Sequence, residues 1–253
     1  MFLAVDIGNT NIRFALFEGN RLKNRFSIPS SPGQVKLPFG RMHAVHAAFV
    51  CSVVPRLTPG ISKLVHSHTG TKPFVVGRDI IVPIENRYRV PGQVGQDRLV
   101  NAYAGCRLYG SPLIIIDFGT AVTFDVVTRS GAYLGGMILP GLRVSLEALK
   151  ERTALLPAVS LTAPPELIGR TTSASMLSGI VHGASALTES LTGKIKKKIG
   201  ARALVIATGG DAALVARFCR SIKRVDADLT LKGLYLLYRE AVSGKRADAS
   251  ICA

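Results

Sequence analysis

The sequence predicts an α/β protein made of two similar halves, each a mixed β-sheet flanked by helices. The main observation is a repeated pattern in which an apolar strand ends in Asp, a Gly-containing turn follows, and two more strands come next. The strand-end Asp is Asp6 in the first copy and Asp117 in the second. Helical patterns follow the strands of both copies. Hydrophobic residues make up 47% of the 253, which is enough for a sizeable core. We therefore expect halves spanning residues 1–111 and 112–253.

The first half begins with three strands joined by tight turns. Residues 2–7 are an apolar run, residues 12–17 a second, and a third surrounds Phe26, after a turn at Gly19. The later elements expected in this half are two core strands and two helices: strands in 48–55 and 72–77, and helices in 56–69 and 97–109.

The second half repeats this order and ends in helices. Its expected strands are 113–118, 122–127, 132–138 and one within 201–210. Its expected helices are 143–152, 171–191, 212–220 and 230–241. Strands alternating with helices in this way indicate mixed sheets covered by helices.

The chain is strongly basic, with a net charge of +16 and a pI near 10.2. Such a balance favours polyanionic partners such as nucleotides, nucleic acid or acidic metabolites. The basic residues are nevertheless scattered. The densest run, Lys194 with Lys196–Lys198, precedes Gly200, where a helix end favours cations anyway.

Several features predict a cytoplasmic protein with no membrane association. No stretch approaches eighteen uninterrupted apolar residues, as a membrane helix requires, and the N-terminal residues do not resemble a signal peptide. The four cysteines are far apart, which favours reduced thiols over a zinc site or a disulfide framework; they are Cys51, Cys106, Cys219 and Cys252.

The first hairpin turn has features of a phosphate-binding loop. Gly8 allows a sharp turn and close approach of a ligand, and Asn9 and Thr10 add polar donors. Asp6, at the end of its strand, could hold a hydrated Mg²⁺ that faces a phosphate. Taken alone, the same residues fit an ordinary hairpin with an Asx-type turn.

The repetition of this hairpin favours nucleotide binding. Asp117, Gly119 and Thr120 occupy the corresponding turn of the second half, and Gly209 with Gly210 ends a later strand at a helix start. Two such hairpins facing each other across a cleft would suit ATP. The Walker A motif and the protein-kinase motifs do not occur, which argues against those two kinase classes.

Asp97 is the candidate catalytic residue. A carboxylate at a helix N-terminus beside Arg98 stays ionised, and it can accept the proton of an attacking hydroxyl. A plain helix N-cap explains the residue equally well. Arg98 could bind a substrate carboxylate, bind a phosphate or pair with Asp97. Asp125 could support a cation site or be a hydrogen-bonded strand residue.

The motifs together resemble one kinase family. Besides the two hairpins and the Thr-Gly-Gly segment, they comprise Tyr88 to Pro91, Gly95 to Arg98, Gly135 to Leu142, and Gly169 to Thr172. In order and spacing, over about residues 1–242, they are similar to type III pantothenate kinases. These enzymes belong to the acetate kinase/sugar kinase/Hsp70/actin superfamily, whose two ribonuclease-H-like halves clamp ATP in a cleft between them.

The resemblance implies phosphorylation of pantothenate to 4'-phosphopantothenate by ATP, the first step of coenzyme A synthesis, with Asp97 accepting the hydroxyl proton. It implies a monovalent cation, K⁺ or NH₄⁺, held by Asp117, beside the Mg²⁺ that the strand-end carboxylate of Asp6 is expected to hold through water. The implied ATP-binding residues are Asp6, Ile7, Gly8, Asn9, Thr10, Asn11, Ile12, Arg13, Gly119, Thr120 and Gly209. The implied pantothenate-binding residues are Tyr88, Gly95, Gln96, Asp97, Arg98 and Thr172. The family is typically a homodimer.

Two other functions fit parts of the sequence. The charge of +16 would suit a nucleic-acid-associated accessory factor for transcription, although no helix-turn-helix, zinc-finger or RNA-recognition motif is present. A kinase for another small alcohol would use the same ATP-binding hairpins. We therefore expect ATP and pantothenate as partners and do not expect nucleic acid, which the charge leaves open.

Overall fold

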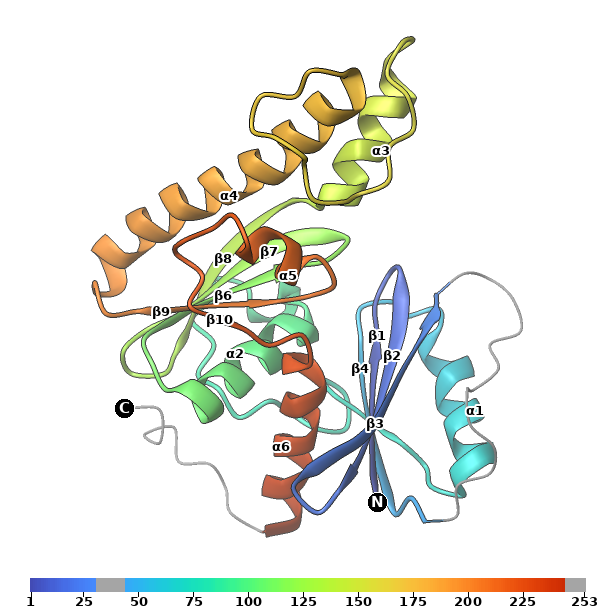
Figure 1. Cartoon of the computed structure of the whole chain (residues 1–253). Helices are drawn as coiled ribbons and strands as arrows, with labels where there is room; N and C mark the ends of the chain where they lie inside the picture. The colour runs from blue at the N-terminus through green and yellow to red at the C-terminus, as the bar shows by residue number, and fades with distance from the viewer. Residues whose placement is uncertain (31–43, 244–253) are drawn as a thin grey trace. The chain divides into compact units, whose positions relative to one another are not determined.

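The computed structural model describes residues 1–30 and 44–243, and these form two compact units. The first comprises Met1–Leu108 together with the C-terminal helix, and the second comprises Tyr109–Asp228. Each unit contains one five-stranded sheet with helices beside it (Figure 1).

The sheet of the first unit has the strand order β3-β2-β1-β4-β5. The strands β1, β2 and β3 are antiparallel neighbours, whereas β4 and β5 continue the sheet in parallel with β1. The strands are β1 (Phe2–Ile7), β2 (Asn11–Glu18), β3 (Arg21–Pro29), β4 (Ala47–Ser52) and β5 (Phe74–Val75). The helices are α1 (Thr58–Thr69), the short 3₁₀ helix η1 (Pro91–Gln93), α2 (Gln96–Tyr109) and α6 (Leu229–Ser243).

The two faces of this sheet pack against different helices. Alternate side chains of a strand point to opposite faces, so Leu3, Val5 and Ile7 share a cluster with Ile61 and Val65 of α1. The opposite face carries the even-numbered residues of β1, which are Phe2, Ala4 and Asp6. This second face therefore combines an apolar end with a carboxylate at the end of β1.

The helix α6 packs on the first unit, although the predicted boundaries placed residues 112–253 in the second half. Its contacts are with β1, β2 and β4. Tyr235 stacks on Phe17 with ring centroids 4.5 Å apart, and Tyr238 stacks on Phe2 at the same distance. These aromatic pairs bury a large apolar area, which explains why the chain returns to its first unit.

The second unit repeats the topology of the first. Its sheet has the order β10-β9-β6-β7-β8, with β6, β7 and β8 antiparallel and with β9 and β10 parallel to β6. The strands are β6 (Leu113–Phe118), β7 (Ala121–Val127), β8 (Tyr133–Pro140), β9 (Leu204–Thr208) and β10 (Arg224–Val225). The helices are α3 (Leu142–Arg152), α4 (Thr172–Ile199) and α5 (Ala212–Ala216). The predicted duplication is therefore confirmed.

The long helix α4 crosses one face of this sheet, with α3 beside its first turns (Figure 1). Val181 and Ile195 of α4 share a core cluster with Ile116, Phe118 and Phe124 of the sheet. The opposite face holds the residues that alternate with these, among them Asp117 and Thr123. As Asp6 does in the first unit, Asp117 lies on the face opposite the core cluster that contains the neighbouring residues of its strand.

Most predicted elements occur close to their predicted bounds. The helix α4 is longer than predicted and ends at Ile199, with its last turn rich in lysine and Gly200 following as the C-cap. The edge strand β10 was not predicted. Three of the cysteines are free and buried, while Cys252 lies outside the described residues. Within residues 1–30 and 44–243, no helix has the length and apolar character needed to span a bilayer.

For two glycines within helices, we expect substitution by Ala to have opposite effects on the stability of the protein. A Cβ at Gly193 of α4 would meet no atom within 4 Å, so Gly193→Ala should stabilise the protein by about 0.5–1 kcal/mol through helix propensity. A Cβ at Gly233 of α6 would lie 2.6 Å from Val100 Cγ1 and 3.0 Å from the Val100 carbonyl oxygen. Gly233→Ala should therefore destabilise it by about 1–3 kcal/mol. Urea unfolding of both variants checks this, and a Gly233→Ala protein as stable as wild type would contradict it.

Candidate functional site

The first hairpin turn is held by backbone bonds and by the end of β3. The Gly8 amide donates to the Asn11 carbonyl at 3.0 Å, which closes the turn between β1 and β2. The buried Ser30 hydroxyl donates to the Gly8 carbonyl at 2.7 Å, and the Ser30 amide donates to the Thr10 carbonyl at 2.9 Å. Asn9 is exposed at the tip. This leaves a fixed turn whose polar tip faces solvent.

A row of three polar side chains crosses the sheet just below this turn. Asp6 of β1 pairs in register with Arg13 of β2 and with Cys51 of β4, so the three side chains lie on one face. Arg13 donates to Asp6 Oδ2 from Nη2 at 2.6 Å and from Nε at 3.1 Å. Because Asp6 is only 6% exposed, this ion pair compensates the burial of its charge.

Asp97 lies close enough to this row for its negative charge to affect the Cys51 thiol. Burial raises the pKa of the Cys51 thiol well above its usual range, and the negative charges of Asp6 and Asp97 raise it further. Both carboxylates therefore act on the same thiol. A Cβ at Gly95 would lie 3.8 Å from Val53 Cγ1, and the Val53 amide donates to the Ile7 carbonyl at 3.1 Å, so the start of α2 lies beside the end of β1.

The start of α2 fixes the Asp97 carboxylate. The amides of Arg98 and Leu99 donate to the Gly95 carbonyl, so Gly95 is at the N-cap and Asp97 lies in the first turn. Asp97 Oδ1 also accepts from the Arg98 amide at 2.9 Å. A Cβ at Gly95 would lie 2.5 Å from Asp97 Oδ1, so a larger residue there would displace the carboxylate. The N-cap interpretation of Asp97 is wrong, because Gly95 has that position.

Of the other predicted pantothenate residues of this unit, Gln96 and Arg98 lie in the first turn of α2. Gln96 packs over Gly77, where a Cβ would lie 2.6 Å from Gln96 Cδ. Arg98 is buried, at 7% exposure. Tyr88 is half-buried, and its amide donates to Asn86 Oδ1 at 3.0 Å. Sequence reasoning missed Gly77, because its φ of +86° and its contact with Gln96 become visible only in the structure.

The second hairpin repeats the turn of the first. The Gly119 amide donates to the Ala121 carbonyl at 3.1 Å, and Thr120 is exposed at the tip. The Thr120 carbonyl accepts from the Gly141 amide at 3.0 Å, which ties the turn to the end of β8. Gly209 lies beside it, and a Cβ there would overlap Asp117 Oδ1 and the Phe118 carbonyl. The predicted residues Asp117, Gly119 and Gly209 therefore gather in one place.

A second row of side chains crosses the sheet below this turn. Asp117 of β6 pairs in register with Thr123 of β7 and with Thr208 of β9. Asp117, Thr123 and Thr208 correspond in topology to Asp6, Arg13 and Cys51 of the first unit. The sequence motifs identified Asp117, whereas the position of Thr208 beside it becomes visible only from strand pairing.

Other polar residues near this row have structural partners. Asp125 is fully buried and accepts from Thr123 Oγ1 at 3.1 Å and from Tyr133 OH at 2.9 Å, which fits a hydrogen-bonded strand residue. Arg143 forms an ion pair with Asp211 at 2.9 Å, which the sequence did not predict. In the part of the chain that is described, no three His, Cys, Asp or Glu side chains gather as a metal cluster.

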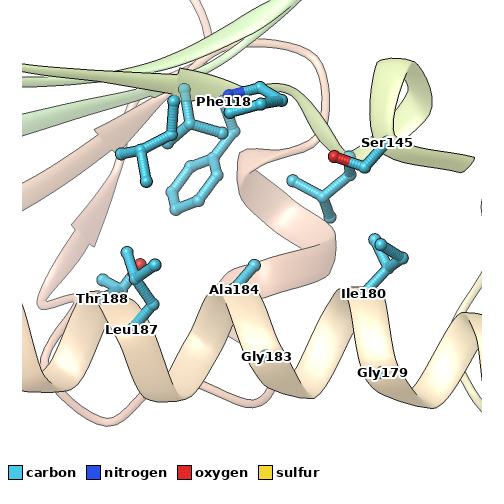
Figure 2. Close-up of a pocket in the computed structure, with 12 residues that line it drawn as sticks. Phe118, Ser145, Gly179, Ile180, Gly183, Ala184, Leu187 and Thr188 are labelled. Atoms are coloured by element: carbon cyan, nitrogen blue, oxygen red, sulfur yellow. The ribbon is translucent and has the colours of Figure 1, made fainter. Parts of the chain in front are cut away.

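The second unit also contains an apolar cavity of about 260 Å³ between its sheet and α4. Figure 2 shows Phe118 opposite Ala184 and Leu187 of α4, with Thr188 at one end and Ser145 at the other. Phe118 and Asp117 are consecutive and point to opposite faces of the sheet. The cavity is therefore on the other side of the sheet from the row of Asp117.

Thr172 is the remaining predicted site residue. It is the first residue of α4, after the N-cap Thr171, whose side chain accepts from the Ala174 amide at 3.2 Å. Thr172 itself is exposed. It belongs to the second unit, whereas Tyr88 and Asp97 belong to the first.

Comparisons with known proteins give the same family as the motifs. The type III pantothenate kinase family profile matches residues 2–194. A type III pantothenate kinase of Moorella thermoacetica is 38% identical over 250 residues, covering 94% of this chain and 98% of that protein. One of Paramagnetospirillum magneticum is 40% identical over 252 residues, covering 94% and 97%.

The fold agrees with a solved structure. A Campylobacter jejuni protein assigned to the Baf family of transcriptional activators has a TM-score of 0.59 and 20% identity, covering 95% of this chain and 99% of that one. At this identity the likeness concerns the fold alone. The family assignment rests on the profile and on relatives of 38% and 40% identity over nearly their full length. The chain belongs to the type III pantothenate kinase family.

Proposed function

We propose that this protein transfers the γ-phosphoryl group of ATP to the primary hydroxyl of pantothenate, giving 4'-phosphopantothenate, the first step of coenzyme A synthesis. The observation that carries the proposal is the gathering of Asp97, Asp6 and the first hairpin turn in one unit, in a chain of this family. Phosphoryl transfer depends on positioning and charge neutralisation, and such a site supplies both.

Asp97 is the proposed general base. Its carboxylate accepts the hydrogen bond of the pantothenate hydroxyl, directs the oxygen toward the γ-phosphorus and takes up the proton. The first turn of α2 keeps Asp97 ionised, since a helix N-terminus favours negative charge. We propose that Tyr88, Gly95, Gln96, Arg98 and Thr172 bind the rest of pantothenate.

The two hairpins are the proposed phosphate-binding elements. The turn from Asp6 to Arg13 would bind phosphate groups through its amides, its polar tip and the Arg13 guanidinium. In the second hairpin, Gly119, Thr120 and Gly209 would bind ATP. The absence of a Cβ at Gly209 lets its backbone lie against Asp117 Oδ1 and the Phe118 carbonyl, which places it beside the second hairpin turn.

The cations proposed for the reaction are Mg²⁺ and K⁺ or NH₄⁺. Both Arg13 hydrogen bonds to Asp6 fall on Oδ2, so Oδ1 is the oxygen we propose for a water ligand of Mg²⁺. Mg²⁺ would neutralise charge on the phosphates. Asp117 is the proposed carboxylate for the monovalent cation.

A homodimer in the cytoplasm is the proposed state of the enzyme. The segment between α3 and α4 exposes large apolar side chains, among them Leu155 at 92%, Ile168 at 80% and Leu167 at 67%. Exposed apolar residues gathered in one segment are typical of surfaces that bind another chain. The free thiols of Cys51, Cys106 and Cys219 fit a reducing compartment.

The test is ADP release from ATP and Mg²⁺, with and without pantothenate and K⁺. We expect turnover that requires pantothenate and rises with K⁺, and none with a pantothenate analogue that lacks the primary hydroxyl. A folded protein that releases no ADP with pantothenate under any of these conditions would overturn the proposal. Turnover with a different alcohol alone would assign the hairpins to another substrate.

A further inference from the structure

Thr208 carries a hydroxyl that the fold buries and leaves unpaired. The residue is fully buried, and its Oγ1 has no hydrogen-bond partner among residues 1–30 and 44–243. Native structures rarely retain such a group, because burial removes its water without replacing the hydrogen bond. Such a hydroxyl can serve a bound partner as a ligand, and its neighbours decide whether one fits there.

The position of Thr208 indicates what that partner is. Strand pairing places its side chain next to Asp117, on the same face of the sheet. Gly209 follows, at a φ of +91°, and lies against Asp117 Oδ1, which a Cβ at this position would overlap. A carboxylate and a neutral hydroxyl oxygen side by side are ligands that hard cations prefer.

In the corresponding row of the first unit, a side chain of the protein neutralises the carboxylate. There Arg13, across the antiparallel strand from Asp6, supplies the positive charge at 2.6 Å. In the second unit the residue at that position is Thr123, which is uncharged and donates to Asp125. At corresponding positions, the row therefore has the positively charged Arg13 in the first unit and the uncharged Thr123 in the second.

We propose that the Thr208 hydroxyl is a ligand of the monovalent cation beside Asp117, and that this cation takes the role that Arg13 has in the first unit. The proposal rests on the proposed function, which assigns K⁺ or NH₄⁺ to Asp117. A lone pair of Oγ1 can serve either ion, as a ligand of K⁺ or as an acceptor from NH₄⁺. Thr208 is thereby a positioning residue for the cation.

The test replaces only the hydroxyl. Thr208→Val keeps the shape of the side chain, and Thr188→Val is a matched control because Thr188 is the other fully buried threonine with an unpaired Oγ1 in the described chain. Melting temperatures are measured against K⁺ concentration, with choline chloride keeping the ionic strength constant. Mg²⁺ and a non-hydrolysable ATP analogue are present throughout, so the readout is binding and not turnover.

We expect wild type and Thr188→Val to show the same K⁺-dependent rise in melting temperature. Thr208→Val should need about tenfold more K⁺ for half of its rise, as expected for loss of one polar contact to a charged group. Without K⁺ it should melt no lower than wild type, because the lost hydroxyl has no protein partner. An unchanged K⁺ dependence in Thr208→Val would overturn the proposal, and so would a wild-type protein whose melting does not respond to K⁺.

A second pair of variants covers the case in which Thr208→Val does not fold. Thr208→Ser keeps the hydroxyl and should keep the wild-type K⁺ dependence. Thr208→Ala should need about tenfold more K⁺ for half of its rise in melting temperature, as Thr208→Val does. Equal K⁺ dependence in Thr208→Ser and Thr208→Ala would overturn the proposal. ADP release with pantothenate is measured separately, so a failed kinase assignment is seen as absent turnover while the K⁺ shift of melting remains.

Discussion

Asp97→Asn should lower kcat by about 10²–10⁴-fold, which is the range that general base catalysis contributes. The amide keeps the shape of the side chain and can still accept from the Arg98 amide. It cannot take up the proton of the attacking hydroxyl. The melting temperature and the affinity for ATP should stay near those of wild type, since the turn that we propose for phosphate binding is formed by other residues.

The measurement is steady-state kinetics with pantothenate, with ATP affinity measured by calorimetry. Glu18→Gln is the matched control, because it makes the same chemical change in the same unit at an exposed residue paired with Lys23. Its kcat should equal that of wild type. If Asp97→Asn kept a kcat within a few-fold of wild type, Asp97 would not be the base.

Asp117→Asn should abolish activation by K⁺. The carboxylate is the only charged group in the row formed with Thr123 and Thr208, so its loss removes most of the attraction for a cation. We expect the rate of this variant in K⁺ to fall to that of wild type without K⁺. The residual rate should no longer depend on K⁺ concentration.

This prediction is checked by titrating turnover with KCl against choline chloride. Glu151→Gln, an exposed residue of α3, is the control for a changed net charge in the second unit. It should retain the K⁺ dependence of wild type. Normal K⁺ activation in Asp117→Asn would show that the ion binds elsewhere.

Local sequence signals were sufficient for much of the fold. Strand periodicity and the turn at Gly19 predicted the first three strands, and the second copy starting at Leu113 predicted the duplicated topology. Both signals depend on residues close together in the chain. The same reasoning identified Asp6 and Asp117 at the ends of their strands.

Contacts between distant residues were not predictable in this way. The packing of α6 on the first unit depends on Tyr235 and Phe17, which are far apart in sequence, and no periodicity reports which sheet a helix covers. The pairing of Asp6 with Arg13 and the burial of Thr208 beside Asp117 follow from strand register. The two-residue strand β10 is too short to give a pattern.

The most direct test of the account is to follow the phosphoryl group itself. The protein is incubated with γ-³²P-labelled ATP, Mg²⁺, K⁺ and pantothenate, and the labelled products are identified by chromatography and mass spectrometry. The account predicts that the label appears in 4'-phosphopantothenate with wild type and is nearly absent with Asp97→Asn. Label that remains in ATP, or that appears only as free phosphate, from folded wild-type protein would contradict it.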